Sequence, residues 1–251
     1  MPEIESLNLA PEHLHKVVAL TGAGISAESG VPTFRGSSGL WKQYRPEELA
    51  TPEAFSDNPR LVWEWYLWRR QLIAQADPNP GHYALVELEE LLKGDFTLIT
   101  QNVDGLHRQA GSKNSIELHG NIFVNRCSQC GQRASDDALD FDSLPPRCPR
   151  CQGAMRPDVV WFGESLNPVN IEDAFAKSRQ ATLFLSLGTS AVVHPAASLP
   201  MLARESGALL IEINPESTPL TPLADLAISD SSARALPPLV EKIRRMKSGE
   251  A

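Results

Sequence analysis

Residues 17–30, with the sequence VVALTGAGISAESG, restrict the possible folds of this chain more than any other stretch. The apolar run at its start predicts a buried strand that leads into a glycine turn and then into a helix. Gly22, Gly24 and Ala27 fit the G-x-G-x-x-G/A spacing of dinucleotide sites, where glycine lets the backbone turn tightly and approach a pyrophosphate. The helix would offer its free N–H groups to the phosphates. A glycine turn that binds no ligand accounts for these residues equally well.

The chain departs from an ordinary dinucleotide fold directly after this turn. Such a fold continues through a helix into a second strand that ends in an acidic residue for the ribose. Here Pro32 disfavours helix at Val31 and ends the helical segment early. We expect the following loop, which contains TFRG at 33–36 and GLW at 39–41, to bring an aromatic side chain and a cation beside the glycine turn.

Further apolar segments predict strands at 96–100, 115–121, 181–187, 208–213 and 224–228, and helical patterns lie at 82–93, 196–206 and 237–246. This alternation predicts an α/β fold, a Rossmann-like doubly wound parallel sheet. Together with the cysteine pairs Cys127-x2-Cys130 and Cys148-x2-Cys151, it predicts a smaller helical plus zinc-ribbon domain inserted into that fold. We assign the nucleotide-binding domain to residues 1–34, 95–125 and 155–251. The small domain then consists of a helical insertion at 35–94 and a zinc-ribbon module at 126–154.

Polar side chains follow several of the predicted strands. Ligands of open parallel sheets bind beyond the carboxyl ends of the strands, where amide and carboxylate groups can bond to sugar hydroxyls or a carboxamide. The side chains and small residues at these ends are Gln101, Asn102, Asp104, His119, Gly188, Thr189, Ser190, Asn214 and Glu216. Taken alone, Asn102 and Asp104 fit a turn or helix-capping role equally well, and a single histidine is more often structural.

All four cysteines lie in two CxxC pairs, Cys127-x2-Cys130 and Cys148-x2-Cys151, which are separated by 17 residues. Two such pairs at this separation indicate a structural zinc site in which every ligand position is taken. Disulfides and a redox-active CxxC pair are the alternatives. Both fit less well, because nothing in the sequence indicates secretion and the flanking Gly131 and Pro149 are typical of zinc-ribbon turns.

The composition, 42% hydrophobic and 22% charged over 251 residues, is that of an ordinary globular protein. A net charge of −8 argues against nucleic acid or an anionic membrane as the main partner. Residues 1–16 contain acids and no apolar core of a signal peptide, and no apolar run reaches the roughly 18–20 residues that span a bilayer. We therefore expect a cytoplasmic protein.

The predicted helix from Asn58 to Ala76 carries an apolar stripe, and Tyr66 and Arg69 lie three residues apart at its margin. Asn58-Pro59 is typical of an N-cap followed by proline at the first helical position. From the pattern alone, a packed tyrosine and a solvated arginine would be the ordinary interpretation.

Five blocks occur in the order found in sirtuins: GAGISAESGVPTFRG, TQNVDGLH, ELHG, CxxC with CxxC, and GTS with INPE. On these blocks the chain, from about Val17 to Leu239, closely resembles the sirtuin family. The resemblance implies an NAD-dependent protein-lysine deacylase that acts on acyl-lysine proteins or peptides. NAD+ would be a consumed co-substrate and zinc a structural ion, one per chain. We expect a monomer that binds neither nucleic acid nor membrane.

The resemblance also implies roles for individual residues. His119 is the implied general base, with Asn102 as the second catalytic residue. The implied NAD-binding residues are Gly22, Ala23, Gly24, Ser26, Phe34, Arg35, Trp41, Gln101, Asn102, Asp104, Gly188, Thr189, Ser190, Asn214, Glu216 and Ser232. The implied substrate-binding residues are Ala50, Tyr66, Arg69, Val160, Phe162, Gly163 and Glu164.

The segment from Ala50 to Arg70 is similar to the sirtuin subclass that removes acidic acyl groups, and Tyr66-x-x-Arg69 is the mark of that subclass. A buried guanidinium and a phenol can together bind a distal carboxylate. The resemblance therefore implies removal of succinyl, malonyl and glutaryl groups as well as acetyl, with Ala50 leaving space for the longer chain. One departure is His194, where many relatives carry tyrosine.

Other functions remain open from the sequence. A zinc-ribbon binding module would usually show a basic face, and residues 126–156 balance five arginines against four aspartates. A dehydrogenase would use the same dinucleotide but would yield reduced nicotinamide. A general protein-lysine deacetylase would differ from the implied function in its preferred acyl group. A mono-ADP-ribosyltransferase would share the first step of the sirtuin reaction and differ in the later steps.

Overall fold

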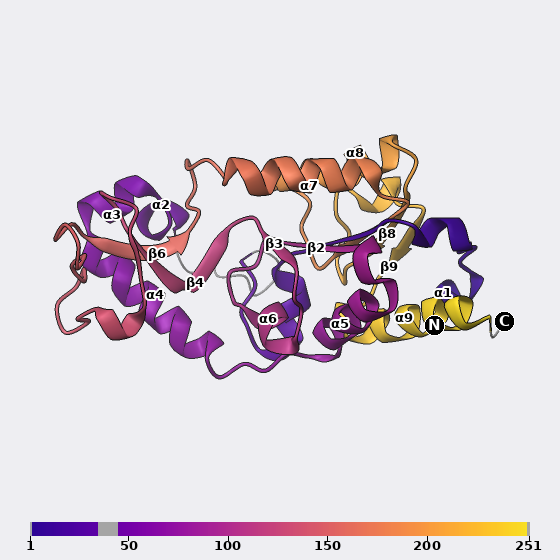
Figure 1. The fold of residues 1–251 in the computed structure, drawn as a ribbon, viewed down its shortest axis with the longest axis horizontal. Coiled ribbons are helices and arrows are strands. Elements are labelled where there is room, and N and C mark those ends of the chain that lie inside the picture. Colours follow the sequence, from indigo (N-terminus) through magenta and orange to yellow (C-terminus); the bar gives the residue numbers. More distant parts are fainter. Residues whose placement is uncertain (1, 35–44, 250–251) are drawn as a thin grey trace.

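The computed structural model describes residues 2–34 and 45–249, and a six-stranded sheet lies at its centre (Figure 1). The strand order is β3-β2-β1-β7-β8-β9, and every neighbouring pair is parallel. The strands are β1 (Val17–Thr21), β2 (Phe96–Thr100), β3 (Ser115–Glu117), β7 (Leu183–Leu187), β8 (Leu209–Ile213) and β9 (Leu226–Ile228). The predicted doubly wound parallel sheet is confirmed.

The centre of the sheet is the place where the strand order reverses. Strand β1 pairs with β2 on one side and with β7 on the other. The chain after β1 leads to α5 (Pro80–Leu92) on one face of the sheet, and the chain after β7 leads to α8 (Leu199–Glu205) on the opposite face. A crevice at this point is where doubly wound sheets bind ligands. The glycine turn that follows β1 is therefore placed at the expected position.

Helices cover both faces of the sheet (Figure 1). Because successive side chains of a strand point to opposite faces, Val17 and Ala19 pack on one side and Val18 and Leu20 on the other. The first face is covered by α1 (Pro2–Ser6), α5 (Pro80–Leu92) and α9 (Ser232–Ser248). The second face is covered by α7 (Pro168–Gln180) and α8 (Leu199–Glu205).

A three-stranded antiparallel sheet of order β5-β4-β6 lies apart from the parallel sheet, beside α2 (Pro46–Leu49), α3 (Pro52–Asp57) and α4 (Pro59–Ile73) (Figure 1). Its strands are β4 (Gly120–Cys127), β5 (Arg133–Ala134) and β6 (Met155–Val159). These elements share an apolar cluster of their own, in which Trp63 is fully buried. The predicted capping of α4 is present, because the Asn58 side chain accepts a hydrogen bond from the Leu61 N–H at 3.1 Å.

Short elements complete the described chain. The helix α6 (Leu106–Ala110) follows β2. The 3-10 turns are η1 (Pro11–Leu14), η2 (Ala23–Ser29), η4 (Lys93–Asp95), η5 (Asp136–Ala138), η6 (Ala196–Ser198) and η7 (Thr221–Leu223). No helix in the described ranges 2–34 and 45–249 is long and apolar enough to cross a membrane.

Three elements differ from the sequence-based expectation. The segment after the glycine turn is the 3-10 helix η2, and no α-helix forms before Gly30 ends it. Helix α9 begins at Ser232, so Pro237 and Pro238 lie inside it and remove N–H donors near its start. Helix α5 packs on α9 and contributes to the apolar core of the parallel sheet, although its residues were predicted to belong to the small-domain insertion.

Candidate active site

A single cavity of about 1170 Å³ collects most of the predicted site residues. It extends from the carboxyl ends of the parallel strands to α4 and the end of β6. The predicted residues that line it are Gly22, Ala23, Gly24, Phe34, Ala50, Tyr66, Arg69, Gln101, Asn102, His119, Val160, Phe162, Gly163, Glu164, Gly188, Thr189, Ser190, Asn214 and Glu216. Arg35 and Trp41 lie outside the described residues.

Two glycine turns meet at the floor of the cavity. The Gly24 N–H donates to the Gly188 carbonyl at 2.8 Å, and a Cβ at Gly24 would stand 2.7 Å from the Gly188 Cα. Gly188 itself has a φ of 57°, in the left-handed region. These glycines are therefore required for the contact between the loops that follow β1 and β7, in addition to the phosphate approach that the sequence suggested.

A buried polar network lies directly behind the cavity wall. The Ser26 hydroxyl donates to Asp104 Oδ2 at 2.8 Å and accepts from Asn102 Nδ2 at 3.2 Å. Burial raises the pKa of Asp104, and hydrogen bonds from the Leu106 N–H and from Ser26 oppose this shift. Ser26 and Asp104 do not line the cavity, and their side chains bond to each other and, through Ser26, to Asn102. Their contact with NAD stays a prediction.

His82 extends this network and is not among the residues predicted from the sequence. The Asn79 N–H donates to His82 Nδ1 at 3.2 Å, so the proton of the neutral ring lies on Nε2, which is 3.4 Å from the Ser26 Oγ. Burial lowers the pKa of His82 to about 4 and keeps the ring neutral. The Asn79-x-x-His82 spacing at the start of α5 forms a capping box, and that pattern is the signal that could have identified it.

His119 follows β3 and lines the cavity. Its Nδ1 lies 3.0 Å from the Gln101 carbonyl oxygen, which can only accept a hydrogen bond, so Nδ1 carries the proton and Nε2 keeps a free lone pair. Burial lowers the pKa of His119, and the bond to Gln101 raises it by less. The ring is therefore neutral at pH 7, with one nitrogen able to take up a proton.

Gly120 allows the strand that follows His119 to pair closely with β6. It has a φ of 80°, and a Cβ there would stand 2.1 Å from the Asp158 carbonyl oxygen. The Val160 N–H donates to the His119 carbonyl at 2.9 Å, and the Phe162 N–H donates to the Ala50 carbonyl at 2.9 Å. The end of β6 is thus connected both to His119 and to the helical segment.

Glu164, predicted to bind substrate, has partners within the protein. It accepts hydrogen bonds from Arg156 at 2.6 and 2.9 Å and from the Trp161 backbone N–H at 2.8 Å. These bonds and the charge of Arg156 lower the pKa of Glu164 against the opposing effect of its partial burial. Its carboxylate therefore stabilises the loop after β6 as well as lining the cavity.

Tyr66 and Arg69 project from α4 to the far end of the cavity, and both are buried. The Arg69 guanidinium lies 4.8 Å from the ring centres of both Phe34 and Trp65. Burial lowers its pKa, and Tyr66 and Asp104 oppose that shift. The Tyr66 hydroxyl oxygen accepts a hydrogen bond from the Trp161 indole N–H at 2.9 Å. The solvated arginine and simply packed tyrosine of the ordinary interpretation are not found.

The opposite end of the cavity is built by the loop after β8. Asn214 Nδ2 donates to the Glu216 carbonyl at 2.6 Å, and the Glu216 side chain is exposed at the cavity edge. Ser232 does not line the cavity, because it is buried in the first turn of α9, and Ser231 lines it instead. His194 also lines the cavity, with Nδ1 3.0 Å from the Ser198 Oγ.

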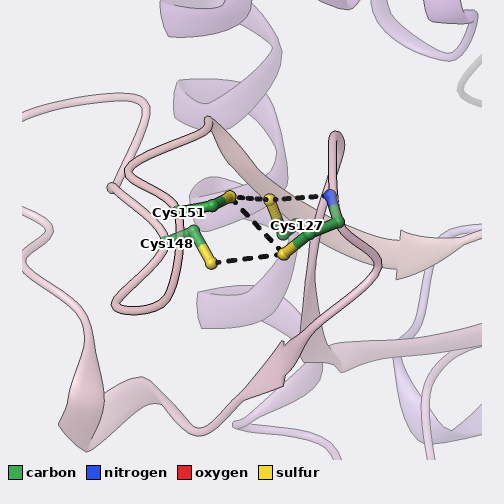
Figure 2. A group of neighbouring side chains, drawn as sticks. Cys127, Cys148 and Cys151 are labelled. Carbon is green, nitrogen blue, oxygen red and sulfur yellow. Dashed lines mark hydrogen bonds between the residues drawn. The ribbon is translucent and has the colours of Figure 1, made fainter.

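The four cysteines converge at one point of the small antiparallel sheet. Figure 2 shows the labelled Cys127, Cys148 and Cys151 side chains turned toward one another, and all four sulfurs lie within 4.8 Å. The Cys127–Cys151, Cys130–Cys148 and Cys130–Cys151 sulfurs are 3.5, 3.8 and 3.4 Å apart. Four ligands about 2.3 Å from a tetrahedral zinc ion stand roughly 3.8 Å apart, whereas disulfide sulfurs stand about 2 Å apart. The arrangement fits one structural zinc ion, and no disulfide is formed.

A family model described as the Sir2 family matches residues 22–195, which include the glycine turn, His119 and all four cysteines. The chain belongs to the Sir2 family. A Sir2 relative from Aquifex aeolicus, named an NAD-dependent protein deacylase, is 54% identical over 91% of this chain and 95% of its own. One from Pyrococcus furiosus with the same name is 52% identical over 91% of this chain and 93% of its own.

Solved Sir2 structures agree with the fold. A mutant Sir2 homologue in complex with ADP-ribose has a TM-score of 0.89 and 45% identity, over 96% of this chain and 98% of that one. A Sir2 homologue in complex with NAD has a TM-score of 0.85 and 48% identity, over 92% and 90% of the two chains. At these identities the comparison supports both the Sir2 fold and the family assignment.

Proposed function

We propose that this chain is an NAD-dependent protein-lysine deacylase that removes succinyl, malonyl and glutaryl groups, and also acetyl. The products are free lysine, nicotinamide and O-acyl-ADP-ribose. Relatives at 50–55% identity over at least 83% of this chain are named NAD-dependent protein deacylases, and a Sir2 structure at 32% identity is described with a p53 peptide and NAD+. NAD+ supplies the ribose carbon to which the acyl oxygen becomes bonded.

The carboxyl ends of the central strands support binding of the dinucleotide. The paired turns at Gly24 and Gly188 leave no Cβ between them, and Gln101 Nε2 donates to the Thr189 Oγ1 across the crevice at 3.0 Å. Asn102 is held by Ser26 at the cavity wall, where its amide can orient the nicotinamide end. In this proposal Glu216, at the opposite end, is close to the ribose of the adenosine half.

His119 has the geometry of a general base. Its protonated Nδ1 is occupied by the Gln101 carbonyl, so Nε2 is available to accept a proton from a ribose hydroxyl. The lowered pKa keeps it unprotonated and competent at neutral pH. We assign to it the deprotonation that lets the hydroxyl attack the activated acyl carbon.

Support for the acidic-acyl preference comes from a comparison of Arg69 with the other buried arginines. Three arginines are buried in the described chain, and Arg70 and Arg156 each have a carboxylate partner, Asp136 at 3.2 Å and Glu164 at 2.6 Å. Within the described ranges, Arg69 forms no such ion pair and borders the cavity. The charge of Asp104 acts on Arg69 only beyond ion-pair distance. A buried charge without a direct ion pair is costly, so an anionic ligand would stabilise this site.

The neighbours of Arg69 support the same conclusion. The rings of Phe34 and Trp65 and the phenol of Tyr66 surround it, at 4.8, 4.8 and 5.7 Å from the guanidinium carbon to the ring centres. These rings exclude water and strengthen an ion pair formed there. The carboxylate of a succinyl or malonyl group is the anion that would reach this end of the cavity from an acylated lysine.

The test is a panel of matched lysine peptides carrying succinyl, malonyl, glutaryl or acetyl groups, incubated with NAD+ and read by mass. We expect faster loss of the acidic groups than of acetyl, with one nicotinamide released for each lysine freed. Acetyl as the best substrate would indicate a general deacetylase. ADP-ribose attached to protein would indicate a transferase, and reduced nicotinamide would indicate a dehydrogenase.

A further inference from the structure

The tryptophan after β6 lies at the end of the cavity formed by Tyr66 and Arg69, and no role was predicted for it from the sequence. Trp161 is 3% exposed, lines the cavity between Val160 and Phe162, and donates its indole N–H to the Tyr66 hydroxyl at 2.9 Å. The two residues are 95 positions apart in the chain. A buried hydrogen bond between two cavity-lining side chains can fix which of their polar atoms face a ligand.

The direction of this bond determines where the phenolic proton points. An indole N–H can only donate, so the Tyr66 oxygen must accept from Trp161. A phenolic O–H stays near the plane of its ring, so the Tyr66 proton points to the side away from Trp161. Burial raises the pKa of Tyr66, which keeps that proton in place. The hydroxyl is left as a donor that needs an acceptor.

Trp161 is itself held on several sides. Its backbone N–H donates to Glu164 at 2.8 Å, the Arg156 guanidinium carbon lies 3.2 Å from its ring centre, and the Phe55 ring packs at 5.2 Å. Arg156 in turn donates to both carboxylate oxygens of Glu164. The indole has little freedom to rotate away from Tyr66, so the orientation that it imposes is firm.

We propose that Trp161 is a positioning residue for acidic acyl groups: its indole N–H orients the Tyr66 hydroxyl so that the O–H donates to the distal carboxylate beside Arg69. This inference rests on the proposed function. Three residues would then select acidic acyl groups together. Arg69 would supply the charge, Tyr66 a hydrogen bond, and Trp161 the direction of that bond.

The test is Trp161→Phe, which keeps an aromatic ring against Phe55 and Arg156 and removes the donor. The readout is the ratio of kcat/KM for a succinyl peptide to kcat/KM for the matched acetyl peptide. We expect this ratio to fall about 3- to 10-fold, the scale of one hydrogen bond. Trp161→Leu, which removes the same donor with a different side chain, is measured alongside and should lower the ratio similarly.

The Tyr66→Phe background separates positioning from packing. Without the phenolic oxygen, Trp161 has nothing to orient, so Trp161→Phe should leave the ratio unchanged in that background. Trp63→Phe is the matched control, because Trp63 is fully buried away from the cavity and donates its indole N–H to the Met155 carbonyl at 2.8 Å. It should lower thermal stability and leave the ratio as in the parent.

The outcomes distinguish failure of the proposed function from failure of this inference. A parent enzyme without a preference for succinyl overturns both. A parent that prefers succinyl, with an unchanged ratio in Trp161→Phe and Trp161→Leu, overturns only the role of Trp161. An equal fall of the ratio in the parent and in the Tyr66→Phe background also overturns that role, because the effect would then not pass through the hydroxyl.

Discussion

At the scale of single residues, hydrogen-bond direction determines what each site group can do. The Gln101 carbonyl leaves His119 Nε2 as a proton acceptor, and the Trp161 N–H leaves the Tyr66 hydroxyl as a donor. Neither direction can be obtained from residue type, since histidine and tyrosine each both donate and accept. The chemistry of the cavity therefore depends on partners that are distant in the sequence.

Replacing His119 by alanine tests the base directly. We expect turnover to fall by about 10²–10⁴, the range for loss of a general base, while NAD+ binding stays close to that of the parent. Steady-state kinetics and a binding titration with NAD+ separate the two effects. Turnover within about twofold of the parent would remove His119 from the proposed role.

The pH dependence gives a second test of the same residue. His119 must be unprotonated to act, and burial lowers its pKa below the ordinary value of 6.5, so activity should persist as the pH falls through 6.5. The acid limb of kcat/KM reports this group in the free enzyme and should have its midpoint below 6.5. A midpoint at or above 6.5 that disappears in His119→Ala would contradict the burial argument.

At the scale of elements, we expect the stability of the small antiparallel sheet to depend on its cysteines. The sheet has three strands, and its strand β5 has only two residues. Backbone hydrogen bonds between so few residues contribute little to the stability of the sheet. A zinc ion held by four thiolates would connect the end of β4 to the segment before β6 and contribute directly to folding.

We therefore expect Cys148→Ser to lose bound zinc and to unfold at a lower temperature, with activity lost alongside. Zinc content and thermal unfolding are the measurements. Ser128→Ala is the control, because it removes only a hydroxyl that donates to the Ala154 carbonyl at 2.9 Å in the same module. A metal-free Cys148→Ser protein that is as stable as the parent would show that the cysteines do not hold a structural ion.

Elements whose signals are local were predictable from the sequence. The strands at 17–21 and 96–100, the capped helix after Asn58 and the two CxxC pairs all lie within short windows of sequence. The start of α9 was missed because Pro237 and Pro238 suggested a boundary that five helical residues in fact precede. The packing of α5 on α9 was missed because an amphipathic pattern does not say which partner covers it.

Site residues also divide into those that local sequence signals predict and those whose contacts depend on distant parts of the chain. That His119 and the glycine turns lie together at one cavity could be predicted, because they follow strands of a parallel sheet and the carboxyl ends of these strands share one edge. Ser26 and Asp104 were predicted to bind NAD, and the sequence did not indicate that their side chains bond to each other behind the cavity wall. The capping-box spacing with Asn79 could have drawn attention to His82, but its contact with Ser26, 56 residues away, could not be predicted from it. Trp161 required tertiary structure, because its partner Tyr66 is 95 residues away.

At the scale of the whole molecule, the cavity lies between the parallel sheet and the helical segment, and we assign a different function to the residues from each. The parallel sheet contributes the glycine turns, Asn102 and His119, which we assign to NAD+ and to proton transfer. The helical segment contributes Tyr66 and Arg69, which we assign to recognition of the acyl group. If this division holds, substrate preference can be changed from α4 without loss of the reaction itself.

The most direct test of acidic-acyl recognition is the kinetics of Arg69→Met on matched succinyl and acetyl peptides, with NAD+ at saturation. We expect kcat/KM for the succinyl peptide to fall. The fall should correspond to a loss of roughly 2–4 kcal/mol of transition-state stabilisation, the scale for removing one partner of a buried charge pair. Activity on the acetyl peptide should hold or rise, because a desolvated charge has been removed. An equal fall on both peptides would show that Arg69 only supports the structure, and would contradict recognition of acidic acyl groups by this chain.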